Sequence, residues 1–110
     1  MKAMVVHAFG AVDALRPQDW PDPVPGDDEV VVDVMAAGVN FSDLLVIGGQ
    51  YQVLPPLPFV PGEEAAGIVS SVGRGVRSCA VGDRVLVLVD RGAYGERVLA
   101  PQESCFVLPG

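Results

Sequence analysis

Short valine-rich runs recur along this chain, and each of them meets glycine or proline within a few residues. The apolar runs cover residues 2–8, 29–35, 66–72, 84–89, 95–100 and 105–108, with turn signals at 23–28, 73–75, 81–83 and 90–92. β-branched residues favour extended backbone, and frequent glycine and proline limit the length of any regular element. The sequence therefore predicts a mainly β fold, either a small barrel or a sandwich.

Only one segment favours a helix. One or two turns can form from Ser42 to Ile47, where Ser42 or Asn40 can accept the free amides at the start and Gly48 suits a left-handed stop. The next segment, 49–62, holds four prolines. It cannot be regular helix or central strand, so we expect an ordered, extended arm.

Length and charge limit what the chain can do. The 110 residues predict a single domain spanning 1–110. The net charge of −7 makes nucleic acids and anionic membrane surfaces poor partners. No apolar run approaches the roughly 20 residues that span a bilayer, and no secretion signal is recognisable at the start. We therefore expect a cytoplasmic protein.

The chain holds few of the side chains that bind zinc or serve as nucleophiles and bases. It has two cysteines, Cys79 and Cys105, and one histidine, His7, which falls in the first predicted strand. These cannot supply a structural zinc site or a convincing Ser-His-Asp or Cys-His arrangement, and we predict no metal. We expect both cysteines to be reduced thiols. The glycine-rich segment 73–78 lacks a following helix, so it predicts a turn rather than a phosphate loop.

Two polar clusters, 37–43 and 60–69, remain as candidates for a binding cleft. Asn40 and Asp43 share one face if the local turn is helical. The Asn40 amide can donate and accept at once, which suits a carboxamide or carbonyl ligand, but it can equally cap the helix. Glu63 and Glu64 are adjacent and point in opposite directions on an extended backbone, so we expect one to be solvated and the other hydrogen-bonded beneath the loop.

Tyr51 lies on the proline-rich arm. Its ring could cover a planar ligand, and its phenol could donate to a carbonyl oxygen. Packing against its neighbours is the alternative. The residues alone thus indicate a β-rich domain with a polar notch around 38–67 and no complete catalytic machinery.

The order of the short motifs resembles a known family. The motifs that carry the resemblance are Phe9-Gly10, 37–43 (AGVNFSD), 49–51 (GQY), 58–63 (PFVPGE), 67–69 (GIV), 81–85 (VGDRV) and 92–96 (GAYGE). Together they resemble the N-terminal, GroES-like domain of the medium-chain dehydrogenases/reductases. More narrowly, they are similar to the zinc-independent, zeta-crystallin-like quinone oxidoreductases.

This resemblance implies a partly open, GroES-like β-barrel with one or two short helices and no Rossmann domain in this chain. It also implies hydride transfer from NADPH to a quinone or an α,β-unsaturated carbonyl compound. The zinc-containing alcohol dehydrogenases of the superfamily have cysteine where Asn40 stands and histidine where Glu63 stands, which implies reduction without metal. By similarity, Asn40 and Tyr51 are the candidate catalytic residues that line the nicotinamide and substrate cleft. Asp43 and Glu64 lie behind them, and with Asn40 they are the candidate cofactor-binding residues.

Family members continue into a cofactor-binding domain, and this sequence stops near the crossover. We therefore expect the isolated chain to bind NADPH weakly, to be inactive, and to form a homo-oligomer through apolar surface left exposed. Two alternatives remain open. One is a free-standing GroES-like binding or assembly module without catalysis, and the other is a fragment of an enoyl-thioester reductase.

Overall fold

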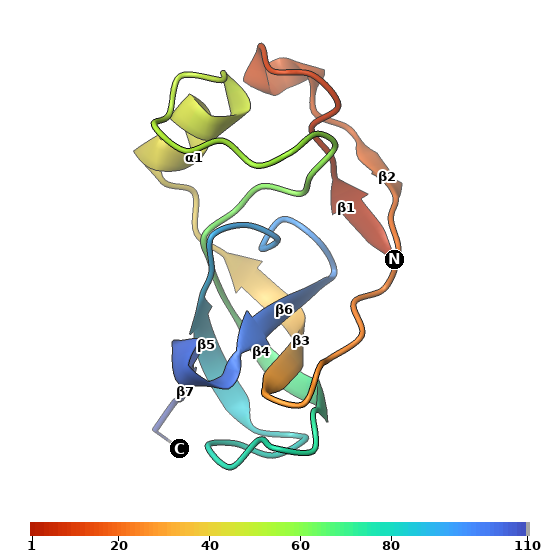
Figure 1. The fold of residues 1–110 in the computed structure, drawn as a ribbon, viewed down its shortest axis with the longest axis vertical. Helices are drawn as coiled ribbons and strands as arrows, with labels where there is room; N and C mark the ends of the chain where they lie inside the picture. The colour runs from red at the N-terminus through yellow and green to blue at the C-terminus, as the bar shows by residue number, and fades with distance from the viewer. Residues whose placement is uncertain (110) are drawn as a thin grey trace.

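The computed structural model describes residues 1–109, which form seven strands and one α-helix (Figure 1). The strands are β1 (Lys2–Met4), β2 (Pro17–Asp19), β3 (Glu29–Ala37), β4 (Glu64–Val72), β5 (Arg84–Leu88), β6 (Arg97–Pro101) and β7 (Cys105–Val107). The helix α1 is Phe41–Ile47, and the 3-10 turns are η1 (Val12–Ala14) and η2 (Gln102–Ser104). The predicted mainly β fold with one or two short helices is confirmed. Within residues 1–109, no helix has both the length and the apolar character needed to cross a membrane.

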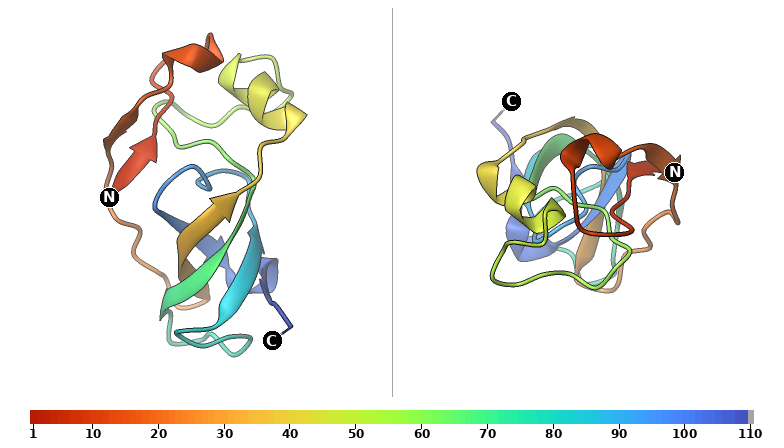
Figure 2. Two further views of the ribbon diagram at one scale, coloured as in Figure 1. Left: turned by 180° about the vertical axis from the view of Figure 1, so that it is seen from behind. Right: turned by 90° about the horizontal axis from the view of Figure 1, so that it is seen from above.

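Five strands form one antiparallel sheet in the order β6-β3-β4-β5-β7. The two nine-residue strands, β3 and β4, lie at its centre. Their pairing register shifts twice, between Val31 and Val32 and between Val34 and Ala36. Such bulges increase the local twist, and the sheet curls into a half-barrel (Figure 2). Strands β1 and β2 form a separate two-stranded sheet.

Valine side chains fill the concave interior of the sheet. The main buried cluster contains Val30, Val32, Ala65, Val69, Val76, Val85, Val87, Ala93, Val98, Ala100 and Cys105. Burying one valine contributes about 1.5–3 kcal/mol, whereas an exposed ion pair contributes about 0–1 kcal/mol. The apolar cluster, rather than the surface charges, therefore stabilises the sheet.

The helix and the arm 49–62 occupy the end of the molecule away from the C-terminus (Figure 1). A second buried cluster of Val6, Ile47 and Phe59 joins them to the N-terminal segment. Val6 and Phe59 exchange both backbone hydrogen bonds, at 2.8 and 3.1 Å. Apart from that single bridge, the arm contains no strand and no helix, as predicted.

Several local predictions were wrong. The first strand ends at Met4 instead of residue 8, and His7 is an exposed residue beyond it whose ring lies 2.6 Å from the Gln18 side chain. Strand β2 was not predicted, because its sequence Pro-Gln-Asp carries no apolar alternation. The left-handed glycine after α1 is Gly49, with φ of 74°, while Gly48 remains right-handed.

The glycine-rich segment 73–78 is a turn, as predicted. The Gly73 N–H donates to the Glu29 carbonyl at 2.8 Å, and the Gly75 N–H donates to the Asp27 carbonyl at 2.7 Å. These bonds hold the β4–β5 loop against the start of β3. No helix follows within that loop, so a dinucleotide phosphate loop is not formed there.

Candidate functional site

The junction between β3 and α1 brings the first polar cluster against the start of β4. At this junction the Gly38 N–H donates to the Glu64 carbonyl at 3.2 Å. A Cβ added to Gly38 would lie 2.0 Å from Oε1 of Glu64. Only glycine therefore allows the half-buried Glu64 side chain to lie directly over the junction.

Asn40 is the N-cap residue of α1, with φ of −114° and ψ of 158°. The Asp43 N–H donates to the Asn40 carbonyl at 3.1 Å, and Oδ2 of Asp43 accepts the Asn40 N–H at 2.9 Å. The Asp43 carboxylate thus closes the start of α1 onto the Asn40 backbone. The structure brings Asn40 and Asp43 together as their spacing predicts, and the Asn40 side chain remains half-buried at the surface.

Asp43 is 1% exposed. Among residues 1–109 it is the only charged side chain that is buried. Its Oδ2 also accepts a hydrogen bond from the Tyr94 hydroxyl at 2.9 Å. Burial raises the pKa of Tyr94, and the hydrogen bond to Asp43 and the charges of Asp43 and Glu63 raise it further. Tyr94 therefore stays a phenol and a donor throughout the neutral range.

A second contact joins α1 to the segment before β4. The Ser42 hydroxyl donates to the Glu63 carboxylate. Next to it, Gly62 has φ of 105°, and a Cβ there would lie 2.5 Å from Cδ1 of Tyr94. The site is thus assembled from three segments that are distant in sequence: 38–43, 62–64 and 93–94. Glu63 and Glu64 are both half-buried, Glu63 bonded to Ser42 and Glu64 against Gly38, so neither is the freely solvated carboxylate that we expected.

Tyr51 lies apart from this cluster. It is 41% exposed on the arm, and no hydrogen bond among residues 1–109 joins its hydroxyl to Asn40 or Asp43. Sequence reasoning missed the roles of Tyr94 and of the Ser42–Glu63 contact. Tyr94 stands 51 positions from Asp43, so the only available signal was its motif, Gly-Ala-Tyr-Gly.

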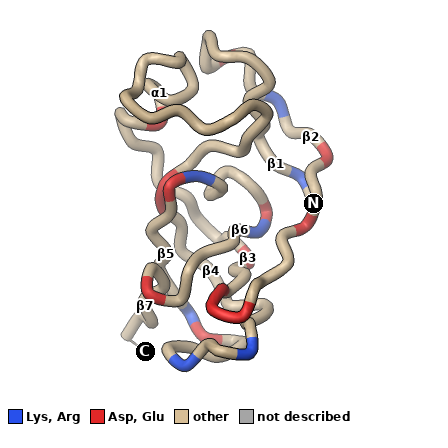
Figure 3. The backbone as a smooth tube through the Cα atoms, in the orientation of Figure 1, with Lys and Arg blue, Asp and Glu red and all other residues tan. Residues whose placement is uncertain are grey.

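The distribution of charge distinguishes this end of the domain. Residues 44–62 contain no charged side chain, and Figure 3 shows the acidic and basic residues spread over the rest of the chain. Val39 and Phe41, on either side of Asn40, are 72% and 75% exposed. The polar junction is therefore bordered by uncharged, largely apolar surface.

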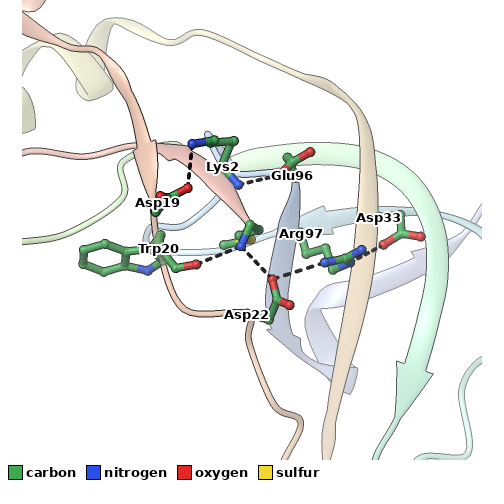
Figure 4. Close-up of polar contacts among 8 residues, drawn as sticks. Lys2, Asp19, Trp20, Asp22, Asp33, Glu96 and Arg97 are labelled. Atoms are coloured by element: carbon green, nitrogen blue, oxygen red, sulfur yellow. Dashed lines mark hydrogen bonds and ion pairs between the residues drawn. The ribbon is translucent and has the colours of Figure 1, made fainter.

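A separate hollow lies away from the polar junction. It has a volume of about 650 Å³, and its walls include Trp20, Asp22, Pro58, Phe59 and Arg97. The charges there pair with one another, as Figure 4 shows: Arg97 contacts Asp22 at 3.2 Å and Asp33 at 3.0 Å. Asp33 and Asp22 raise the pKa of Arg97. These satisfied pairs make the hollow a structural feature rather than the candidate site.

Asp22 is also anchored by the N-terminus. The Met1 ammonium contacts Oδ1 of Asp22 at 3.0 Å and donates to the Trp20 carbonyl at 3.0 Å (Figure 4). The hydrogen bond from this ammonium lowers the pKa of Asp22. Lys2 adds an exposed pair with Asp19 at 2.6 Å. This network fixes the two-stranded sheet and contributes no group to the polar junction.

Comparison with known proteins places the fold in a family. Residues 26–110 match the alcohol dehydrogenase GroES-like domain. The synaptic vesicle membrane protein VAT-1 homolog of Rattus norvegicus is 41% identical over 99% of this chain and 28% of its own length. The quinone oxidoreductase of Sus scrofa is 38% identical over 99% of this chain and 34% of its own length.

A solved structure supports the same family assignment. The quinone oxidoreductase of Escherichia coli complexed with NADPH superimposes with a TM-score of 0.91 at 34% identity, covering 99% of this chain and 33% of that one. The chain thus spans about a third of the length of the proteins it matches. Since the domain match covers well over half of the sequence, the chain belongs to the family of alcohol dehydrogenase GroES-like domains, and its relatives include the quinone oxidoreductases.

Proposed function

We propose that residues 1–110 are the N-terminal portion of the catalytic domain of an NADPH-dependent, zinc-free oxidoreductase. The reaction is hydride transfer to a quinone or an α,β-unsaturated carbonyl compound. The quinone oxidoreductase relatives support the reaction class. The NADPH complex of the Escherichia coli relative supports the choice of cofactor.

The observation that carries this proposal is the half-buried Asn40 amide at a junction bordered by uncharged, largely apolar surface. A nicotinamide ring and a quinone are both planar and carry carbonyl groups that need hydrogen bonds. The half-buried Asn40 can donate to and accept from such groups. The exposed Val39 and Phe41, together with the charge-free segment 44–62, offer apolar contact to the rings.

The remaining residues have supporting roles in the proposal. Asp43 accepts hydrogen bonds from the Asn40 backbone N–H and the Tyr94 hydroxyl, so it fixes the start of α1 and the backbone position of Asn40. Glu64 lies over Gly38 and shapes the floor beneath the cofactor. Tyr51 contributes from the arm, where its exposed ring can cover a bound ligand. NADPH supplies the hydride, and these residues bind and orient the reactants.

The donor atoms at the junction support reduction without zinc. Zinc sites in proteins are built mainly from thiolate and imidazole, with carboxylates as additional ligands. The junction offers the Asn40 amide, and two of its carboxylates already accept protein donors: Glu63 from Ser42, and Asp43 from Asn40 and Tyr94.

The proposal extends to partners and location. The net charge of −7 disfavours nucleic acids and anionic membranes as partners, and we propose a cytoplasmic protein. We also propose that the 110-residue chain alone binds NADPH weakly and is inactive. The pyrophosphate and adenosine of the cofactor require a phosphate-binding loop and helix N-terminus, which the described fold does not provide.

Amide chemical-shift mapping of the chain tests this function. Titration with NADPH, and separately with duroquinone, is expected to shift the resonances of residues 38–43 and 51, with dissociation constants of about 1 mM or weaker. Asn40→Ala is expected to reduce both responses, while the exposed Gln50→Ala serves as the control. Shifts confined to other regions, or responses unchanged in Asn40→Ala, would contradict the proposed site.

A further inference from the structure

Two cysteine thiols from separate segments lie next to each other at the edge of the sheet. Cys79 is in the β4–β5 loop, and Cys105 is the first residue of β7. Both are free, and their Sγ atoms are 3.9 Å apart. Cys105 is 5% exposed within the main apolar cluster, whereas Cys79 is half-buried at its border.

The Gln102 side chain holds the two segments together independently of the thiols. The Arg77 N–H donates to Oε1 of Gln102 at 2.9 Å, and Nε2 of Gln102 donates to the Gly75 carbonyl at 3.2 Å. On the other side, Cys105 pairs with Val87 of β5. Both cysteines therefore sit on backbone that is fixed in place, so their approach does not depend on a chance rotation of a mobile loop.

We propose that Cys79 and Cys105 form a reversible intramolecular disulfide, with a small-molecule disulfide such as oxidised glutathione as the oxidant. The sulfur atoms must approach from 3.9 Å to about 2.05 Å, a change within reach of side-chain rotation and small loop adjustment. Nothing in the proposed reductase chemistry uses either thiol, so this site is independent of it.

The exchange balances in two steps. First, the Cys79 thiolate attacks one sulfur of oxidised glutathione, forming a mixed disulfide and releasing one glutathione. Then Cys105 loses its proton and attacks the Cys79 sulfur, closing the protein disulfide and releasing the second glutathione. The two protein thiols lose two electrons and two protons, and both appear in the two reduced glutathione molecules.

The surroundings set the order of these steps. Cys79 is the more accessible thiol, so it meets the oxidant first. Burial raises the pKa of the Cys105 thiol to about 12, and the neighbouring Cys79 and the Asp83 carboxylate contribute to the rise. Closure by Cys105 is therefore the slow step, and the Cys79–glutathione adduct accumulates transiently.

Closure would join the β4–β5 loop covalently to the edge strand β7. Besides the register with β5, β7 is held by a hydrogen bond from the Leu108 N–H to the Arg84 carbonyl at 2.9 Å. A cross-link between residues 26 positions apart removes conformations from the unfolded chain. The oxidised form is therefore expected to melt at least about 5 °C higher than the reduced form.

The experiment incubates the purified 110-residue chain in glutathione buffers of stepped redox potential and then blocks free thiols. Trypsin cleaves after Arg77, Arg84 and Arg97, so the disulfide links peptide 78–84 to peptide 98–110. We expect that linked pair, preceded by glutathione on 78–84, in a protein that has no intermolecular disulfide and regains both thiols on reduction. Melting of the two forms is followed by circular dichroism.

Variants of each cysteine test whether the linked peptide and the melting shift depend on the Cys79–Cys105 pair. Cys79→Ser changes a half-buried residue and is expected to abolish the linked peptide and the melting shift. Cys105→Ala is expected to stop the reaction at the Cys79–glutathione adduct, and Val81→Ser, which changes a side chain of the same loop that is 61% exposed, is the control. The proposal is overturned if the native chain forms only persistent glutathione adducts or intermolecular dimers, or if the linked form melts no higher than the reduced one.

Discussion

At the scale of single residues, the buried Asp43 carboxylate depends on hydrogen-bond donors from its surroundings. A buried carboxylate is costly unless donors replace the water it has lost. Here the donors are the Asn40 N–H and the Tyr94 hydroxyl, which both reach Oδ2. Because the two donors come from different segments, Asp43 couples the start of α1 to the loop before β6.

We predict that Tyr94→Phe destabilises the domain by about 1–3 kcal/mol, because Asp43 loses a donor and stays buried. Urea unfolding followed by circular dichroism measures this change. Tyr51→Phe is the matched control, since Tyr51 is 41% exposed, and its effect is expected to stay within about 0.5 kcal/mol. Equal effects of the two substitutions would show that the Asp43–Tyr94 bond contributes nothing.

Alkaline pH provides a second residue-level prediction. The pKa of the Cys105 thiol rises from 9.0 to about 12 on folding, chiefly through burial. Below pH 9 both states keep the proton, but above it only the unfolded chain releases it, so the free energy of unfolding falls as the pH rises. The slope from this group is at most about 1.4 kcal/mol per pH unit.

Urea unfolding at intervals between pH 8 and 11, under a phosphine reductant, measures the pH dependence. Cys105→Val removes the titrating thiol and is expected to flatten the curve relative to the native chain. Tyr94, whose pKa is also raised, adds to the decline above pH 10. A stability that is constant or rises over this range would contradict the prediction.

At the scale of elements, α1 depends on tertiary contacts. Its seven residues are too few for a stable isolated helix. Ile47 supplies the anchoring contact in the cluster with Val6 and Phe59, and Ser42 adds the hydrogen bond to Glu63. The position of Asn40 therefore depends on packing at the opposite end of the helix.

Ile47→Ala is expected to cost about 2–5 kcal/mol through lost burial and a cavity. Leu44→Ala on the same helix removes a side chain that is 41% exposed, and it is expected to cost less than about 1.5 kcal/mol. Thermal unfolding of the two variants, monitored alongside amide exchange in α1, gives the comparison. A larger loss from Leu44→Ala would mean that α1 is anchored through the other face.

The sequence predicted correctly those strands whose own residues favour extended backbone. The valine runs at 29–35 and 84–89 became strands because alternating or continuous β-branched side chains are buried there. Strand β2 escaped prediction because it forms through pairing with Lys2–Met4, a partner outside its own sequence. At the site, Asn40 and Asp43 follow from their spacing, whereas the Tyr94 contact depends on how distant loops meet.

At the scale of the whole molecule, the β5–β7 edge of the half-barrel carries exposed apolar groups. Leu88 is 47% exposed, and Phe106 and Val107 on the edge strand β7 are 48% and 51% exposed. An exposed apolar edge strand is a template for pairing with another chain. We therefore expect the chain to associate with itself as its concentration rises.

Analytical ultracentrifugation over a concentration series tests this expectation. A Phe106→Ser/Val107→Lys double variant is expected to weaken association about tenfold or more by charging the edge. Val24→Ser changes a side chain that is 80% exposed and distant in sequence from β7, and it serves as the control. A monomer at every concentration, or equal weakening by Val24→Ser, would refute the role of β7.

The paired backbone bonds between Val6 and Phe59 have an evolutionary consequence. They fix one point of the arm to the N-terminal segment, whereas residues 51–57 belong to no strand or helix. Insertions or deletions that adapt the domain to larger or smaller ligands can be accommodated in the part of the arm before Phe59. On the other side of Phe59, Gly62 lies close to Tyr94 and Glu63 is bonded to Ser42. The length of the segment from Phe59 to Glu63 is therefore expected to be invariant wherever this architecture recurs.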